Sequence, residues 1–301
     1  MGYRIRPSER FSEEFKAAGA EQLDEAIAVL TTHPEGMLEA IHAARKNFKK
    51  LRSLYRLVAD DVPVFRDREN ARIRNMARTL SALRDATALV EVSRYLLEHA
   101  RNDDERVMLE RVKKILSDHF KDNEGATTEI AESVASAIAT CSQALEALSR
   151  VDFKGGKKRD ETRIDKGWRT LLKRARAAWR ACENTTDTHL FHELRKRGQD
   201  YRHYLSLLRD LWPSAMHAKR VAASEMVDLL GHHNDLALLT SFANAHPHLF
   251  TRSEDIAHLL SAVIARQEAL RQSALQLADE VFLDRPRDEA RRIALLWRNA
   301  A

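Results

Sequence analysis

Two segments of the 301-residue chain decide its fold: residues 42–56 read HAARKNFKKLRSLYR, and residues 192–206 read HELRKRGQDYRHYLS. At about 100° of rotation per helical residue, the cations of each segment gather on one side, and Leu and Tyr side chains occupy the other. Each segment therefore predicts an amphipathic helix that packs its apolar face and turns a basic face outward. The predicted first stripe is His42, Arg45, Lys46, Lys49, Arg52 and Arg56, and the predicted second stripe is His192, Arg195, Lys196, Arg202 and His203.

Helical periodicity extends over nearly the whole chain, and no segment has a convincing strand pattern. The chain has only 9 Gly and 6 Pro, and aromatic residues make up 6%. Sandwiches and barrels need many turns and strand formers, so the predicted fold class is all-α. Helices are expected at residues 11–30, 35–60, 63–100, 105–121, 127–150, 162–181, 187–211, 214–243, 253–283 and 287–299.

The two basic segments are parts of a longer internal repeat. A shift of 150 residues, without a gap, superposes His42 on His192 and Pro63 on Pro213. We interpret this register as a duplication, with two helical bundles packed around a pseudo-two-fold axis. The first bundle is expected at residues 1–152 and the second at 162–301, joined by a basic, Gly-containing linker at 153–161.

The charge distribution indicates a polyanionic ligand. The net charge of +5 says little by itself. Within residues 42–56, however, six residues are basic and none is acidic. Lys46 and Lys50, like Arg52 and Arg56, are like-charged at the i,i+4 spacing, which destabilises an isolated helix. Two such stripes point to a counter-charge supplied by an extended polyanion.

Arg and Lys suit phosphate oxygens, because Arg offers a bidentate fork and Lys a mobile point charge. Nucleic acid, inorganic polyphosphate and acidic polysaccharide all remain open as ligands. The stripes carry no aromatic residue on which a base could stack, and no nucleic-acid-binding motif has the required spacing.

The expected compartment and the lack of membrane contact are inferred from features that the sequence does not contain. Cys141 and Cys182 form no disulfide framework, which favours a reducing compartment. The first residues contain no apolar leader segment, and no apolar run approaches the ~20 residues of a membrane span. We therefore expect a cytoplasmic protein without a membrane partner.

Four segments together resemble a known family. AIHAARKNFKKLRSLYRL at 40–57 and LFHELRKRGQDYRHYLSLL at 190–208 resemble the two signature helices of CHAD domains, the conserved histidine α-helical domains. LSALRDATAL at 80–89 and LLGHHNDLALL at 229–239 resemble the helix that follows each signature. The similarity covers about residues 10–297, and it is that of a stand-alone member, without a CYTH triphosphatase domain.

The resemblance implies two antiparallel four-helix bundles related by pseudo-symmetry, with basic residues that line a groove or pore. It also implies non-catalytic binding of inorganic polyphosphate, with nucleic acid only a weaker, non-specific competitor, and no cofactor. Gln199 stands where the family pattern has Lys, so the second stripe is expected to bind more weakly. Besides the two stripes, the candidate polyphosphate-binding residues are Lys50, Lys16, Lys166, Arg169 and Lys173.

Other sites find little support in the sequence. The His pairs lack a carboxylate or Cys at metal-ligand spacing, so no metal site is expected. Asp85 and Asp235 are interpreted as acceptors that orient basic residues of the signature helices, or as structural residues. Two alternative functions stay open: an adaptor that recruits acidic proteins or a granule surface, and a polyphosphate-processing enzyme, which would need a metal.

Overall fold

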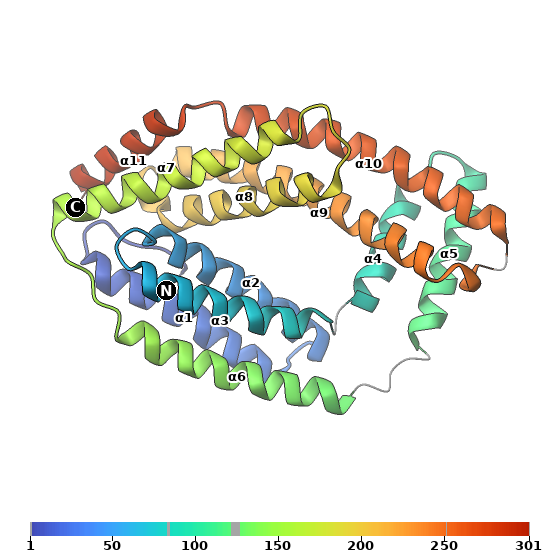
Figure 1. The fold of residues 1–301 in the computed structure, drawn as a ribbon, viewed down its shortest axis with the longest axis horizontal. Coiled ribbons are helices and arrows are strands. Elements are labelled where there is room, and N and C mark those ends of the chain that lie inside the picture. Colours follow the sequence, from blue (N-terminus) through green and yellow to red (C-terminus); the bar gives the residue numbers. More distant parts are fainter. Residues whose placement is uncertain (1, 83–84, 122–126, 251, 301) are drawn as a thin grey trace.

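The computed structural model describes residues 2–82, 85–121, 127–250 and 252–300. Over these residues the chain is all helical without a strand, which confirms the predicted fold class (Figure 1). Single turns of 3-10 helix occur at Arg209–Leu211 and Pro247–Leu249. The α-helices are α1 (Phe11–Thr32), α2 (Met37–Leu57), α3 (Pro63–Ala82), α4 (Asp85–Glu98), α5 (Asp103–Lys121), α6 (Thr127–Ser149), α7 (Lys157–Ala181), α8 (Thr188–Leu207), α9 (Pro213–Ala245), α10 (Ser253–Val281) and α11 (Pro286–Ala300).

The helices form three packing groups. α1 packs on α2 and α6, and α3 completes that group by packing on the same two helices. α8 packs on α7 and α9, and α11 lies along α7. At one end of the molecule, α4 and α5 pack against α9 and α10, so that elements of both predicted repeats meet there (Figure 1).

The helix bounds are compatible with the predicted duplication. Shifted by 150 residues, α2 falls on α8, and Pro63 at the start of α3 falls on Pro213 at the start of α9. Pro suits this first helical position because its fixed φ is helical and its missing N–H needs no partner there. The larger apolar core contains residues of both repeats, such as Tyr55 and Tyr201. The repeat boundaries themselves stay a prediction.

Two predicted helix bounds are wrong. Residues 63–100 were expected as one helix, but they divide into α3 and α4, which belong to different packing groups. Helix α7 begins at Lys157, inside the expected linker and five residues earlier than predicted. Gly156 has a φ of +123°, a conformation that L side chains rarely adopt, and it turns the chain directly into the helix.

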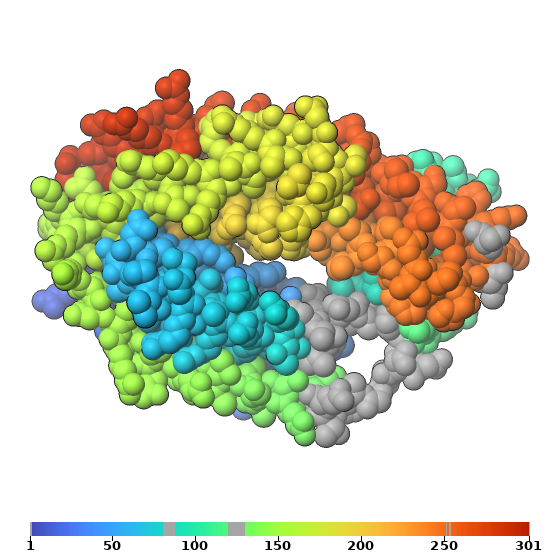
Figure 2. Space-filling view, in the orientation of Figure 1, coloured from blue at the N-terminus to red at the C-terminus, as the bar shows by residue number. Residues whose placement is uncertain are grey.

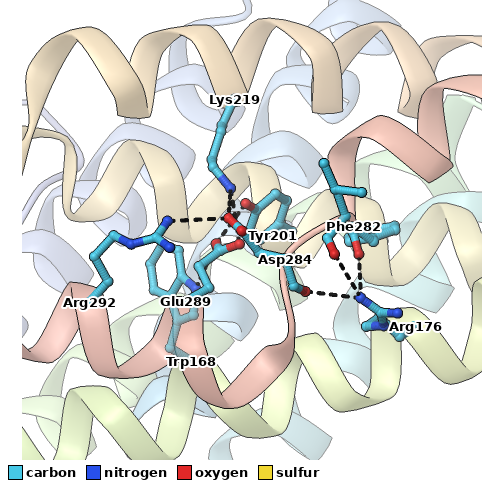
Figure 3. Close-up of polar contacts among 9 residues, drawn as sticks. Trp168, Arg176, Tyr201, Lys219, Phe282, Asp284, Glu289 and Arg292 are labelled. Atoms are coloured by element: carbon cyan, nitrogen blue, oxygen red, sulfur yellow. Dashed lines mark hydrogen bonds and ion pairs between the residues drawn. The ribbon is translucent and has the colours of Figure 1, made fainter.

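A buried polar cluster ties α7, α8 and α9 to α11 (Figure 3). The carboxylate of Glu289 is 2% exposed. It accepts hydrogen bonds from Trp168 Nε1 at 3.0 Å, Tyr201 Oη at 2.8 Å and Lys219 Nζ at 3.0 Å. Burial of a carboxylate is costly unless such donors satisfy it, so this cluster fixes how the four helices meet.

The N-terminal segment bonds to the C-terminal halves of both α2 and α8. Tyr3 Oη donates to the carbonyl of Lys50 on α2 at 2.8 Å, and the Ile5 amide donates to the carbonyl of Leu207 on α8 at 2.8 Å. These bonds connect the N-terminal segment to both signature helices. Among the helices that the structure describes, none combines the length and apolar character needed to cross a membrane.

Candidate anion-binding site

A pocket of about 920 Å³ opens between the signature helices α2 and α8. Helices α3, α4 and α9 complete its wall. Figure 2 shows the surface hollowed between the blue and cyan residues of the first half and the yellow and orange residues of α8 and α9. Among the described residues, the lining holds nine Arg and Lys, three His and five Asp and Glu: Arg45, Lys46, Lys49, Arg52, Arg56, Arg74, Arg195, Lys196, Arg197, His42, His192, His203, Glu39, Glu91, Glu193, Asp200 and Asp235.

The pocket brings most of the predicted site residues together. Ten of the sixteen line it, from both stripes: His42, Arg45, Lys46, Lys49, Arg52, Arg56, His192, Arg195, Lys196 and His203. Two helices that are about 150 residues apart in sequence thus turn their basic faces toward a shared space. The charge pattern placed each stripe on an outward face, and only the family resemblance implied that basic residues line a common groove or pore.

Six predicted residues lie elsewhere. Lys50 Nζ lies 5.8 Å from the centre of the Tyr3 ring, and Arg202 pairs with Asp228 at 3.7 Å. The other four belong to α1 and α7. Lys16 Nζ donates to the Ser149 carbonyl, Arg169 pairs with Asp165, Lys166 lines a separate hollow at the start of α7, and Lys173 is exposed.

Cations of the first stripe are held in place by neighbouring helices. Arg45 Nη1 donates to the carbonyl of Ala77 on α3 at 2.8 Å. Arg52 Nε donates to Oδ1 of Asn70, also on α3, at 2.8 Å. Burial, together with the charge of Arg56, lowers the pKa of Arg52 to about 10, so its guanidinium stays charged at neutral pH.

In the second stripe, the contact of Lys196 lies along α8 itself. Glu193 Oε1 accepts from Lys196 Nζ at 2.5 Å, and its Oε2 accepts from Arg197 Nη2 at 3.2 Å. The hydrogen bond from Lys196 lowers the pKa of Glu193. Burial is the main cause that lowers the pKa of His192, and the charge of Lys196 adds to it. His192 is therefore neutral at pH 7.

The guanidinium of Arg195 lies against the backbone of α9. A methyl group at Gly231 would lie 3.1 Å from Arg195 Nη2 and 3.5 Å from its Cζ. The absence of a side chain at Gly231 thus lets Arg195 rest on α9 at the pocket wall.

The floor of the pocket is a buried polar network that joins the two signature helices. Asp200 on α8 accepts from Ser53 Oγ at 2.7 Å and from Arg56 Nη1 at 2.5 Å, both on α2. Ser53 Oγ also lies 3.0 Å from Nδ1 of His203. Burial, followed by the charge of Arg202, lowers the pKa of His203 well below its usual value, so the ring is neutral.

A family model for the CHAD domain matches residues 21–244. The chain belongs to the CHAD domain family. No curated protein matches the chain. The matched span contains every pocket-lining residue and both signature helices, which confirms the resemblance that the sequence motifs indicated.

Sequence reasoning missed two cations of the CHAD pocket. Arg74 comes from α3, which carries no stripe, and only the packing of α3 on α2 brings it to the wall. Arg197 directly follows Lys196, so its place beside the motif could have identified it. Four of the five acidic residues in the lining, all except Asp235, were missed as well, because the stripes were selected for positive charge.

The two Asp residues assigned an orienting role have different outcomes. The side chain of Asp85 lies outside the described residues. Asp235 lines the pocket, and its charge raises the pKa of His232 on its own helix, although burial lowers that pKa overall. Whether Asp235 orients a basic residue of α8 stays a prediction.

Proposed function

We propose that this CHAD domain binds inorganic polyphosphate in the pocket between α2 and α8, without catalysing a reaction. The convergence of both basic stripes on one pocket carries the proposal. An elongated polyanion can contact cations of α2 and α8 at once, whereas a single phosphate would need only one of the stripes. The surplus of cations over carboxylates in the lining favours a ligand of high negative charge density.

The residue types in the pocket favour polyphosphate over single-stranded nucleic acid. The described lining residues include no Phe, Tyr or Trp. Base stacking on aromatic rings is a main source of affinity for single strands, so such a pocket lacks the usual platform. A chain of phosphates needs only the Arg, Lys and His donors that the pocket offers. Nucleic acid is therefore expected as a weaker competitor.

The cysteines support a cytoplasmic location for the protein. Cys141 and Cys182 are free and buried, and burial raises the pKa of each thiol to about 12. Protonated, buried thiols behave as small core residues, in keeping with a reducing compartment.

Direct titration with long-chain polyphosphate tests the proposal, with single-stranded DNA and heparin as competitors. We expect tight binding that weakens steeply with salt and resists both competitors. Phosphate release is followed in parallel with Mg²⁺ and with Mn²⁺, and none is expected. Equal affinity for all three polyanions would reduce the site to a general basic surface, and salt-insensitive binding of an acidic protein would favour an adaptor.

A further inference from the structure

The second stripe carries its own counter-ion inside the pocket. Glu193 lines the pocket and lies within hydrogen-bonding distance of both Lys196, at 2.5 Å, and Arg197, at 3.2 Å. The carboxylate side chain is 28% exposed, and that of Lys196 is 49% exposed, so a ligand that enters the pocket can reach the pair. Ion pairs at i,i+3 and i,i+4 are common on helices, and the position of this pair in an anion pocket is what sets it apart.

The first stripe differs at the corresponding place. Shifted by 150 residues, Glu193 falls on Ala43 and Lys196 falls on Lys46. Lys46 also lines the pocket, and it forms no ion pair with any residue that the structure describes. The two lysines are thus equivalent in the repeat but differ in their surroundings.

This difference changes what a phosphate gains from each lysine. A phosphate that contacts Lys46 replaces water and salt ions, and their release favours binding. A phosphate that contacts Lys196 must first displace Glu193. This displacement breaks an ion pair and releases no salt ion. The carboxylate also repels the incoming anion.

We propose that Glu193 is a built-in counter-ion that competes with polyphosphate for Lys196 and Arg197, so that the ligand occupies the first stripe before the second. This inference rests on the proposed function. It assigns Glu193 a role in setting affinity, and it gives the pocket an order of filling from α2 to α8.

The test compares Glu193→Gln with Glu39→Gln by titration with polyphosphate of defined length at several salt concentrations. Both changes remove one negative charge from the lining, but Glu39 forms no ion pair within the described part of the chain. In Glu193→Gln, polyphosphate no longer has to break an exposed ion pair. The affinity of this variant for polyphosphate should therefore rise by up to about fivefold. For Glu39→Gln we expect a smaller rise in polyphosphate affinity, because this change only lowers the overall negative charge of the lining.

The salt dependence separates competition from a general charge effect. With Glu193 removed, Lys196 and Arg197 attract anions from the solvent, and polyphosphate displaces these anions when it binds. The slope of log affinity against log salt then steepens by about one to two. Glu39→Gln should leave the slope of the wild type unchanged. In the reverse variant, Ala43→Glu, the new carboxylate stands three residues before Lys46, and both affinity and slope should decrease.

The outcomes are distinct. If wild-type protein binds but the two Gln variants share one affinity gain and one slope, the inference about Glu193 is overturned and the proposed function stands. If wild-type protein does not bind polyphosphate at all, both are overturned. Thermal unfolding of each variant verifies that the fold is retained, which is expected because both carboxylates lie at the surface of their helices.

Discussion

Ser53 and His203 are 150 residues apart, at equivalent positions of the predicted repeat, and their side chains meet, with Ser53 Oγ 3.0 Å from His203 Nδ1. Equivalent residues of two repeats can touch only near the axis that relates them, so this contact is compatible with a pseudo-two-fold axis between α2 and α8. The single Ser53 proton goes to Asp200, at 2.7 Å. Ser53 Oγ then accepts from Nδ1–H of the neutral His203.

Replacement of Ser53 by Ala should destabilise the fold. Ser53 is fully buried, and its loss leaves Asp200 and His203 each short of a partner. A buried polar group without its partner costs about 1–3 kcal/mol, so the free energy of unfolding in urea should fall by that order. Ser206→Ala is the control, because the Ser206 hydroxyl donates only within its own helix, to the Arg202 carbonyl. Equal stability of the two variants would contradict the role of this network.

The variant Gly231→Ala should separate stability from binding. Ala in place of Gly in a helix interior stabilises by about 0.5–1 kcal/mol. The new methyl group would lie 3.1 Å from Arg195 Nη2, so the guanidinium has to move away from α9. We therefore expect a higher melting temperature together with weaker polyphosphate binding. Unchanged affinity in the stabilised variant would show that the position of Arg195 against α9 does not matter.

Acid should destabilise the protein partly through His233. Burial, with the nearby charge of Arg271, lowers the pKa of His233 from 6.5 to about 4. Between these values the unfolded chain binds a proton that the folded chain does not, so the free energy of unfolding falls as the pH drops from 6.5 towards 4. Urea unfolding at pH 7 and pH 5 should show a smaller loss for His233→Gln than for wild type. His217→Gln, at an exposed position of the same helix, should keep the wild-type loss.

The buried cluster around Glu289 should support the fold but not the pocket. Substitution by Ala removes the acceptor for Trp168, Tyr201 and Lys219. The loss of one member of a buried charge pair costs about 3–5 kcal/mol, which urea unfolding would measure. The control is Asp288→Ala, an exposed acidic residue in the first turn of α11, where about 0.3–1 kcal/mol is expected. No residue of the cluster lines the pocket, so a specific loss of polyphosphate affinity would be unexpected.

The sequence predicted those parts of the fold that depend on local pattern. The basic and apolar faces of residues 42–56 and 192–206 located α2 and α8 closely, because each periodic face is fixed by one helix alone. The internal repeat gave no sign that residues 63–100 divide into α3 and α4, because the equivalent residues of the second repeat form the single helix α9. That difference depends on which neighbours each segment packs against, and periodicity does not encode those neighbours.

Prediction of the pocket residues was limited in the same way, because the sequence pattern does not show how the helices pack. Motif positions identified ten pocket residues, but Arg74 reaches the pocket only through the packing of α3 on α2. Lys166 and Arg169 were predicted as additional wall residues beside the family motifs, but α7 lies along α11 and both residues lie outside the pocket. Charge patterns predict which helix face is basic, and tertiary packing decides which basic faces meet.

Polyphosphate affinity of the double variant Lys46→Ala with Lys196→Ala tests the central claim most directly. Both lysines are exposed, line the pocket and lie at equivalent repeat positions. Lys166→Ala with Lys173→Ala is the matched control, with the same loss of charge outside the pocket. We predict about tenfold weaker binding for the pocket variant, with the larger share from Lys46 because Lys196 is paired with Glu193, and a smaller effect in the control. Equal losses in both variants, or no loss in the pocket variant, would contradict binding between α2 and α8.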